Sequence, residues 1–241
     1  MHAEGSEKPH DFAAANRTYF DEHARGCSGG DHHRHHHHGE EARKLGRRNV
    51  AAMRSAYPLL FDEDTTEVLD YACGVGMLSQ ALCPHVKSIV GVDISQASVD
   101  QYNANASNQG LTPDEMKAVC TELRGEAGEL DDAKFDVVVC CASYHHFPSI
   151  EQTTRVLAHF LKPGGSLLVT DIRAAPDGRV LFKETHHHIV PHKHGFTEDM
   201  IRTAFDGTGL INFEMKDAFK AKMTATGEDT MWFVARGVKP G

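Results

Sequence analysis

The sequence has no long apolar run and no excess of positive charge, and these absences exclude several classes of protein. No apolar stretch approaches the roughly twenty residues that a membrane-spanning helix needs. The first thirty residues lack the charged head and apolar stretch of a secretory signal. The formal net charge of -9, with Asp and Glu spread along the chain, argues against a surface dedicated to nucleic acid. We therefore expect a cytoplasmic protein with no nucleic-acid or membrane partner.

Cysteine is also scarce, with six among 241 residues. Cys73, Cys120, Cys140 and Cys141 fall in or beside predicted buried strands of a chain without an export signal. This placement favours reduced, packing thiols over a disulfide framework. The length suits one large α/β domain with a substantial core.

Histidine, by contrast, is abundant, at 18 residues. Six of them lie in the tract Asp-His-His-Arg-His-His-His-His at positions 31–38. The tract is either a metal-binding segment or a solvated low-complexity insert. The second interpretation is favoured, because adjacent histidines on a flexible loop chelate metal weakly without a rigid frame. No metal site is predicted.

The amino-terminal part is predicted to be a helical cap over residues 1–60. Apolar residues at helical spacing predict helices over residues 11–25 and 40–57. The Gly- and His-rich residues 26–39 between them are predicted to form a loop. The remaining residues, 61–241, are expected to form the main domain.

The main domain alternates short apolar runs with helical segments, as expected of buried parallel strands joined by helices. Right-handed crossovers then predict a doubly wound α/β sheet with helices on both faces. Residues 172–196 break this rhythm with Pro, Gly and a second group of histidines. The expected strands are 67–71, 88–93, 116–120, 135–141 and 165–171, with two more near 210–217 and 229–236, and the expected helices are 76–84, 95–108, 149–161 and 197–207.

A glycine turn between two acidic strand ends predicts a nucleoside site. Gly74-Val75-Gly76 follows the first strand, Asp70 precedes it, and Asp93 ends the second strand, where it can bind ribose hydroxyls. Ligands of such sheets bind outside the carboxyl ends of the strands. A dinucleotide fold would place glycine where Ser79 stands, and Asp70 would face its pyrophosphate unfavourably. S-adenosylmethionine has an ammonium group instead, so the acid favours this cofactor.

Four motifs in order resemble those of class I S-adenosylmethionine-dependent methyltransferases, and in particular the small-molecule branch that includes the ubiquinone and menaquinone biosynthesis enzymes. The resemblance covers about residues 45–236. The four motifs are Val68-Leu-Asp-Tyr-Ala-Cys-Gly-Val-Gly76, Ile89-Val-Gly-Val-Asp-Ile-Ser95, Phe135-Asp-Val-Val-Val-Cys-Cys-Ala-Ser-Tyr-His-His-Phe147 and Leu161-Lys-Pro-Gly-Gly-Ser-Leu-Leu-Val169.

The resemblance implies a seven-stranded, mostly parallel sheet whose last strand runs antiparallel, and a cofactor site. Ala72 stands where the family motif has its first glycine, a mild change because alanine still allows close approach. Residues 26–39 replace an aromatic-Asp lid element that the family often carries. The implied cofactor-binding residues are Asp70, Ala72, Cys73, Gly74 and Gly76 for the methionine part, Asp93 for the ribose, Ile94 for the adenine, and Cys141 after the fourth strand.

Histidines supply the candidate catalytic residues. His145 and His146 follow the fourth strand at the mouth of the site, where a base would help an acceptor that starts protonated. Either could instead pack beneath the loop and donate to a carbonyl. The segment 172–196 lies where the family places a variable substrate-covering insertion, and its His192 and His194 would face one side of an extended strand.

The expected partner is a small-molecule methyl acceptor, with oxygen slightly favoured over nitrogen, carbon or sulfur. No Asn-Pro-Pro-Tyr sequence follows the fourth strand, which lowers the expectation of amine methylation on nucleic acids. The alternatives are a His-rich metal-binding or sensing protein on a methyltransferase scaffold and, less favoured, a nicotinamide dehydrogenase. No oligomeric state is predicted.

Overall fold

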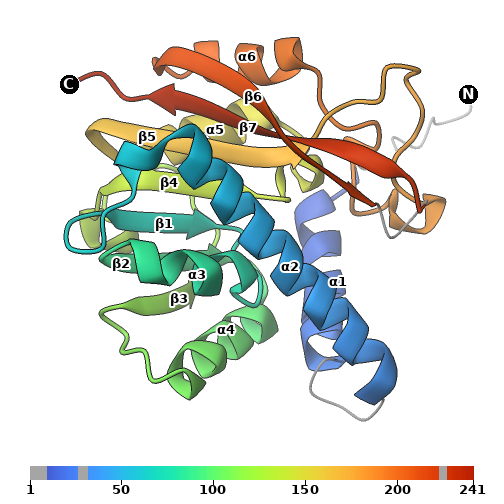
Figure 1. Ribbon diagram of the computed structural model, residues 1–241, viewed down its shortest axis with the longest axis horizontal. Helices are drawn as coiled ribbons and strands as arrows, with labels where there is room; N and C mark the ends of the chain where they lie inside the picture. Colours follow the sequence, from blue (N-terminus) through green and yellow to red (C-terminus); the bar gives the residue numbers. More distant parts are fainter. Residues whose placement is uncertain (1–9, 27–31, 223–226) are drawn as a thin grey trace, which may run out of the picture.

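The computed structural model describes residues 10–26, 32–222 and 227–241, with the backbone but not the side chains of residues 26 and 32–38. Within these ranges the chain forms a seven-stranded sheet in the order β3-β2-β1-β4-β5-β7-β6 (Figure 1). Strand β7 runs antiparallel to β5 and β6, while the pairs from β3 to β5 are parallel. The strands are β1 (Glu67–Tyr71), β2 (Ser88–Asp93), β3 (Met116–Cys120), β4 (Phe135–Cys141), β5 (Leu161–Ile172), β6 (Ile211–Lys222) and β7 (Asp229–Val238).

Helices cover both faces of the sheet. Serine or threonine caps start three of them, because Ser95, Ser149 and Thr197 each accept a hydrogen bond from the backbone three residues on. Among the described residues, no helix combines the length and the apolar character needed to cross a membrane. The helices are α1 (Phe12–Gly26), α2 (His32–Ala56), α3 (Met77–Leu82), α4 (Gln96–Asn108), α5 (Ile150–His159) and α6 (Glu198–Asp206), with short 3-10 turns at Pro58–Leu60, Cys83–His85, Glu129–Asp132, Tyr144–His146 and Glu184–His186.

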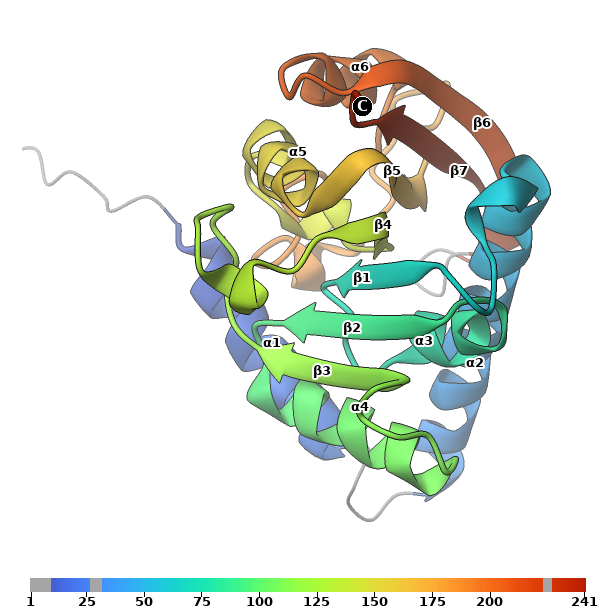
Figure 2. The same cartoon turned by 90° about the vertical axis from the view of Figure 1, so that its left-hand side faces the viewer.

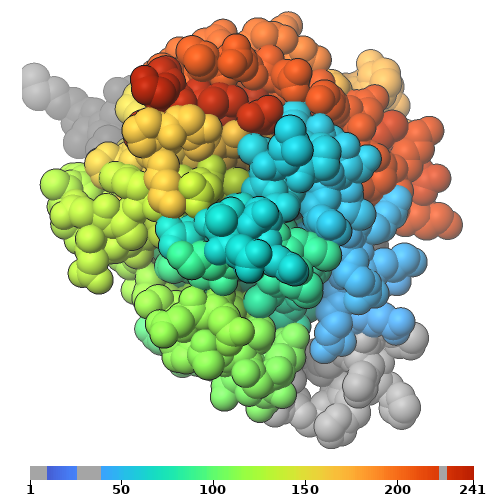
Figure 3. All heavy atoms as spheres, turned by 60° about the vertical axis from the view of Figure 1, so that its left-hand side comes forward, coloured from blue at the N-terminus to red at the C-terminus, as the bar shows by residue number. Residues whose placement is uncertain are grey.

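Alternation along the central strands divides the core between the two faces. Leu69 and Val138 pack with α5 and α6, whereas their neighbours Val68 and Val137 pack with α2 and α3. Figure 3 shows α2, in blue to cyan, lying against the teal segment of α3 and beside the red β6–β7 pair. The sheet is thus buried on both sides, as its nearly continuous apolar strands predict.

The predicted architecture is confirmed, including the antiparallel last strand, but the predicted loop over residues 26–39 is wrong in its second half. Helix α2 begins at His32, and so His32–Gly39 is helical. The prediction relied on composition, yet histidine and arginine do not break helices and no proline interrupts the segment. Gly39 costs the helix only about 1 kcal/mol relative to alanine. Residues 27–31 lie outside the described ranges.

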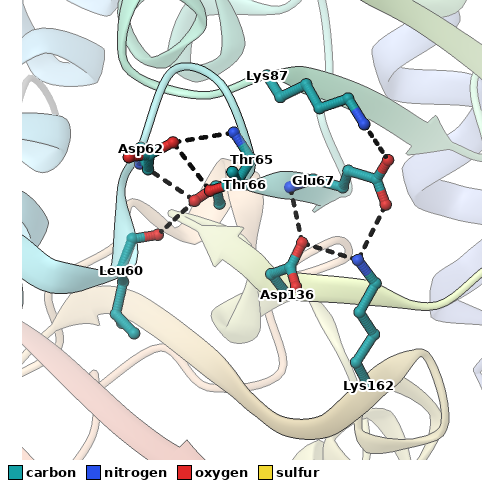
Figure 4. A network of polar contacts seen from close by, with 8 residues as sticks. All are labelled: Leu60, Asp62, Thr65, Thr66, Glu67, Lys87, Asp136 and Lys162. Atoms are coloured by element: carbon teal, nitrogen blue, oxygen red, sulfur yellow. Dashed lines mark hydrogen bonds and ion pairs between the residues drawn. The ribbon is translucent and has the colours of Figure 1, made fainter.

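A polar network joins the strands at the amino edge of the sheet, opposite the predicted site (Figure 4). Glu67 at the start of β1 accepts hydrogen bonds from Lys87 and Lys162, and Asp136 accepts from Lys162 and from the Glu67 backbone. These hydrogen bonds hold the pKa of Glu67 below its usual value. Because the side chains are about a third to a half exposed, the network fixes register more than it adds stability.

Gly76, which precedes α3, has no tolerance for a side chain. Its φ of 87° is left-handed, and a Cβ there would lie 2.7 Å from the buried Tyr102 ring. We expect Gly76→Ala to lower the free energy of unfolding by about 2–4 kcal/mol, since strain and overpacking add. Urea denaturation measures this. Gly110→Ala is the matched control, with φ 78° and open space around its Cβ, and should lose about 1 kcal/mol; equal losses would contradict the packing argument.

Candidate functional site

A cavity of about 900 Å³ opens at the carboxyl edge of the sheet. Its floor is formed by the residues that follow β1, β2, β3 and β4, and its sides by α1, α2 and the first turns of α5. Figure 2 shows α1 lying across the side toward which the arrowheads of β1, β2 and β3 point. The two amino-terminal helices therefore wall the edge where ligands of doubly wound sheets bind.

The turn after β1 brings backbone close to the carboxylate that ends β2. Ala72 and Gly74 adopt φ values of 57° and 52°, which only glycine adopts without strain. The Gly74 amide donates to Asp93 Oδ2 at 2.8 Å, and the Ser95 amide donates to Oδ1 at 2.9 Å. Asp93 lines the cavity with both oxygens held in place, and so its remaining lone pairs have a fixed direction.

Asp70 is a buried carboxylate on the cavity wall, 2% exposed. The Ser79 hydroxyl donates to its Oδ2 at 2.6 Å. Burial nevertheless raises the pKa of Asp70 to about 7, with the neighbouring Asp93 charge adding to the rise. A carboxylate in this state gains most from a cation beside it.

Helix α1 is attached to the residues that follow β2, at one side of the cavity, by polar contacts that the sequence did not predict. Asp21 Oδ1 accepts from the Ser95 hydroxyl at 2.7 Å and from the Ala97 amide at 3.2 Å. Arg17 donates to the Ile94 carbonyl at 3.3 Å. The sequence around Asp21 carries no local signal for such pairing, because its partners are 74 and 76 residues away along the chain.

Helix α2 closes the opposite wall through Gly46. A Cβ at Gly46 would lie 2.6 Å from the Met77 carbonyl, so glycine lets α2 meet the start of α3. One turn to either side, Arg43 and Asn49 line the cavity. Asn49 is fully buried, its Nδ2 donates to the Leu45 carbonyl, and its Oδ1 has no partner among the described residues. Neither residue was predicted to contribute to the site.

His145 is held by a buried acid. Its Nδ1 lies 2.9 and 3.0 Å from the two carboxylate oxygens of Asp171, and its ring stacks on Phe182 of residues 172–196 with centroids 4.6 Å apart. The carboxylate fixes the proton on Nδ1, because it can only accept. His145 is 7% exposed and is not part of the cavity wall.

His146 does lie on the cavity wall. Its Nδ1 is 2.9 Å from the Ile189 carbonyl oxygen. Burial, together with a smaller effect of the adjacent His145, lowers the pKa of His146 to about 3. The ring is therefore neutral at physiological pH.

The structure does not bring His192 or His194 to the cavity wall. His192 packs against Phe196 with ring centroids 5.0 Å apart, and burial lowers its pKa. His194 is exposed, with Nδ1 3.0 Å from the Gly178 carbonyl. Their assignment as catalytic residues stays a prediction without geometric support.

Across the described residues there is no group of three or more His, Cys, Asp or Glu suited to a metal ion. The side chains of the histidine tract lie outside that description.

The cofactor residues expected from the sequence gather in one place. Gly76 is the exception: it is absent from the cavity wall, and its lack of a side chain leaves room for the Tyr102 ring. The expected residues that line the cavity are Asp70, Ala72, Cys73, Gly74, Asp93, Ile94 and Cys141.

Comparison with known proteins places this geometry in a family. The model of a family described as methyltransferase domain matches residues 35–214. An uncharacterized methyltransferase of Schizosaccharomyces pombe is 36% identical over 154 residues, 61% of this chain and 54% of that protein. A ubiquinone biosynthesis O-methyltransferase of Coxiella burnetii is 32% identical over 105 residues, 44% and 43% of the two chains. The chain spans about half the length of the curated relatives it matches.

Solved structures share the fold at low sequence identity. Magnesium protoporphyrin IX methyltransferase of Synechocystis PCC 6803, with SAM bound, superimposes with a TM-score of 0.61 at 17% identity, covering 98% of this chain and 100% of that one. A protein of Bacillus halodurans C-125 described as a putative methyltransferase gives a TM-score of 0.62 at 18% identity, covering 80% of this chain and 99% of that one. Because the family model spans most of the sequence, from residue 35 to residue 214, the chain belongs to the methyltransferase-domain family.

Proposed function

We propose that this chain transfers a methyl group from S-adenosylmethionine to a small-molecule acceptor. The observation that carries the proposal is the cavity at the carboxyl edge, whose wall combines an acid placed for a ribose, Asp93, with a buried acid of raised pKa, Asp70. Family membership supports the reaction class, and a structural neighbour with SAM bound supports the cofactor. The division into a cap over residues 1–60 and a methyltransferase domain over 61–241 with the insertion 172–196 is part of the proposal.

The donor set on the cavity wall fits each part of the cofactor. Asp93 would accept from the ribose hydroxyls, Ile94 would contact the adenine, and Cys141 at the end of β4 would line the same site. Asp70 would neutralise the ammonium, and the unpartnered Asn49 Oδ1 adds an acceptor to the same wall. Arg43 supplies a guanidinium on the α2 wall for the carboxylate. A diphosphate would instead face two carboxylates, Asp70 and Asp93, which disfavours a dinucleotide.

When bound, S-adenosylmethionine supplies an electrophilic methyl group on a sulfonium sulfur. The work of the protein is alignment and exclusion of water, because in-line displacement needs the acceptor atom on the axis of the breaking bond. His146 is proposed to orient the acceptor through Nε2. His145, which lies beneath it with ring centroids 4.2 Å apart and is fixed by Asp171, is proposed as a positioning residue. An oxygen acceptor is favoured, since the similar proteins of Coxiella burnetii and Leptothrix cholodnii are both named ubiquinone biosynthesis O-methyltransferase.

The test has two parts. Calorimetry with S-adenosylhomocysteine should show binding to the purified chain, and incubation with methyl-labelled S-adenosylmethionine and a cell extract should give a labelled small molecule by mass spectrometry. Label in macromolecules instead would contradict the substrate class. Absence of S-adenosylhomocysteine binding would overturn the cofactor assignment.

A further inference from the structure

Two side chains far apart in the sequence converge on one backbone oxygen beside the cavity. Asn16 of α1 donates through Nδ2 to the Ile189 carbonyl at 3.1 Å. His146, after β4, has its Nδ1 2.9 Å from the same oxygen. Both residues line the cavity, and Ile189 belongs to the insertion 172–196. The three segments are thereby fixed relative to one another.

The Asn16 amide has only one orientation that satisfies its neighbours. Its Nδ2 also donates to the Phe12 carbonyl at 2.8 Å, so both amide protons are used. A flipped amide would place Oδ1 against two carbonyl oxygens, which cannot donate. In the orientation present, Oδ1 has no partner among the described residues although the side chain is 5% exposed. Buried polar atoms are rarely left unpaired, so Oδ1 indicates a missing donor.

His146 presents an acceptor as well. The Ile189 carbonyl can only accept, and Nδ1 must therefore carry the ring proton. Nε2 is then unprotonated, and the lowered pKa of His146, about 3, keeps it so across the physiological range. The Phe20 ring meets the His146 ring edge-on with centroids 5.3 Å apart, and Phe147 adds apolar wall.

We propose that Asn16 Oδ1 and His146 Nε2 form an acceptor pair that reads two hydrogen-bond donors on the methyl acceptor. The inference rests on the proposed function and narrows its substrate class to a largely apolar molecule that carries hydroxyl or N–H donors. A carboxylate or phosphate at this position would place its oxygens against two acceptors. The shared Ile189 carbonyl gives the insertion a role in setting the pair, even though its His192 and His194 lie away from the cavity.

Matched small probes test the pair directly. With the protein saturated by S-adenosylhomocysteine, ligand-observed NMR titrations would compare phenol with anisole, and aniline with N,N-dimethylaniline, with benzoate as an anion. We expect each donor-bearing probe to bind at least about tenfold more tightly than its methylated partner, and benzoate to bind more weakly than phenol. Equal affinities within each pair would overturn the inference.

Variants assign the preference to the two residues. Asn16→Ala removes Oδ1, and His146→Asn deletes the Nε2 acceptor while its amide can still donate to Ile189. Each should lower the ratio of aniline affinity to N,N-dimethylaniline affinity, because aniline carries two N–H donors, one for each acceptor. The matched control is Thr18→Ala on the same helix, an exposed residue whose hydroxyl donates to the Ala14 carbonyl, and it should keep the parent ratio.

Two further outcomes separate this inference from the proposed function. An unchanged ratio in Asn16→Ala or His146→Asn would overturn the inference while leaving the cofactor assignment intact, provided S-adenosylhomocysteine still binds. Failure of the parent to bind S-adenosylhomocysteine would overturn both. If Asn16→Ala does not fold, as judged by its melting transition, the parent ratio and His146→Asn still decide.

Discussion

Replacing Asp93 by alanine is expected to weaken S-adenosylhomocysteine binding by about 100-fold or more. A hydrogen bond to a charged group contributes about 1.5–3 kcal/mol, and the ribose offers two hydroxyls. The loss is compounded because Asp93 also accepts from the Gly74 and Ser95 amides, which orient the turn around the cofactor. Isothermal titration calorimetry at pH 8 measures the effect.

The control for this prediction is Asp100→Ala in α4. Asp100 is exposed, and its Oδ1 accepts a hydrogen bond from the Gln96 side chain four residues before it. Its removal takes away the same formal charge from the same region while leaving the cavity wall intact. A dissociation constant that changes equally in both variants would show that Asp93 acts through general charge and not through the ribose.

Asp70 should make both stability and cofactor affinity depend on pH. The pKa is raised from 3.8 to about 7 in the folded chain, so between these values the folded state binds more protons than the unfolded state. Stability therefore falls as pH rises from about 4 to about 7, by about 4 kcal/mol from this group alone, and levels off above. An ammonium group prefers the ionised acid, so affinity for S-adenosylhomocysteine should fall up to about tenfold for each pH unit below 7.

Asp70→Asn separates the two effects. The amide keeps the shape but cannot ionise, so the variant should be more stable than the parent at pH 8 in urea denaturation. It should also bind S-adenosylhomocysteine weakly and with no slope between pH 5.5 and 8. A slope that persists in Asp70→Asn would assign the pH dependence to another group and remove Asp70 from the ammonium site.

The strands and their order along the chain were predictable because each is a short, nearly continuous apolar run. Such runs predict strands that are buried on both faces of the sheet, and the glycine turn and Asp93 indicate the edge of the sheet where a ligand is expected to bind. The extent of α2 was not predictable in the same way. Its first turns are rich in histidine, whose helix preference is weak, and the decision depends on the packing of the later turns against α3.

The residues that α1 and α2 contribute to the site could not be predicted, for a different reason. Asn16, Asp21 and Asn49 are ordinary polar residues on amphipathic helices, and their polar atoms either bond to residues distant in sequence or have no partner in the part of the chain that the structure describes. The histidines show the reverse problem. His145, His146 and His192 have the same chemistry in the sequence, and only tertiary packing places His146 on the wall, His145 beneath it and His192 away from it.

The contacts of Asn16 and His146 with the Ile189 carbonyl also affect how the substrate specificity of such a protein can diversify. The proposed cofactor contacts come from the strand ends and the two amino-terminal helices, whereas residues 172–196 contact two residues of the cavity wall, Asn16 and His146, through the Ile189 carbonyl. Changes of length or composition in that segment would move the two proposed acceptor atoms, Asn16 Oδ1 and His146 Nε2, without disturbing the proposed adenosine site. Selection could in this way retune what is methylated while inheriting the donor machinery unaltered.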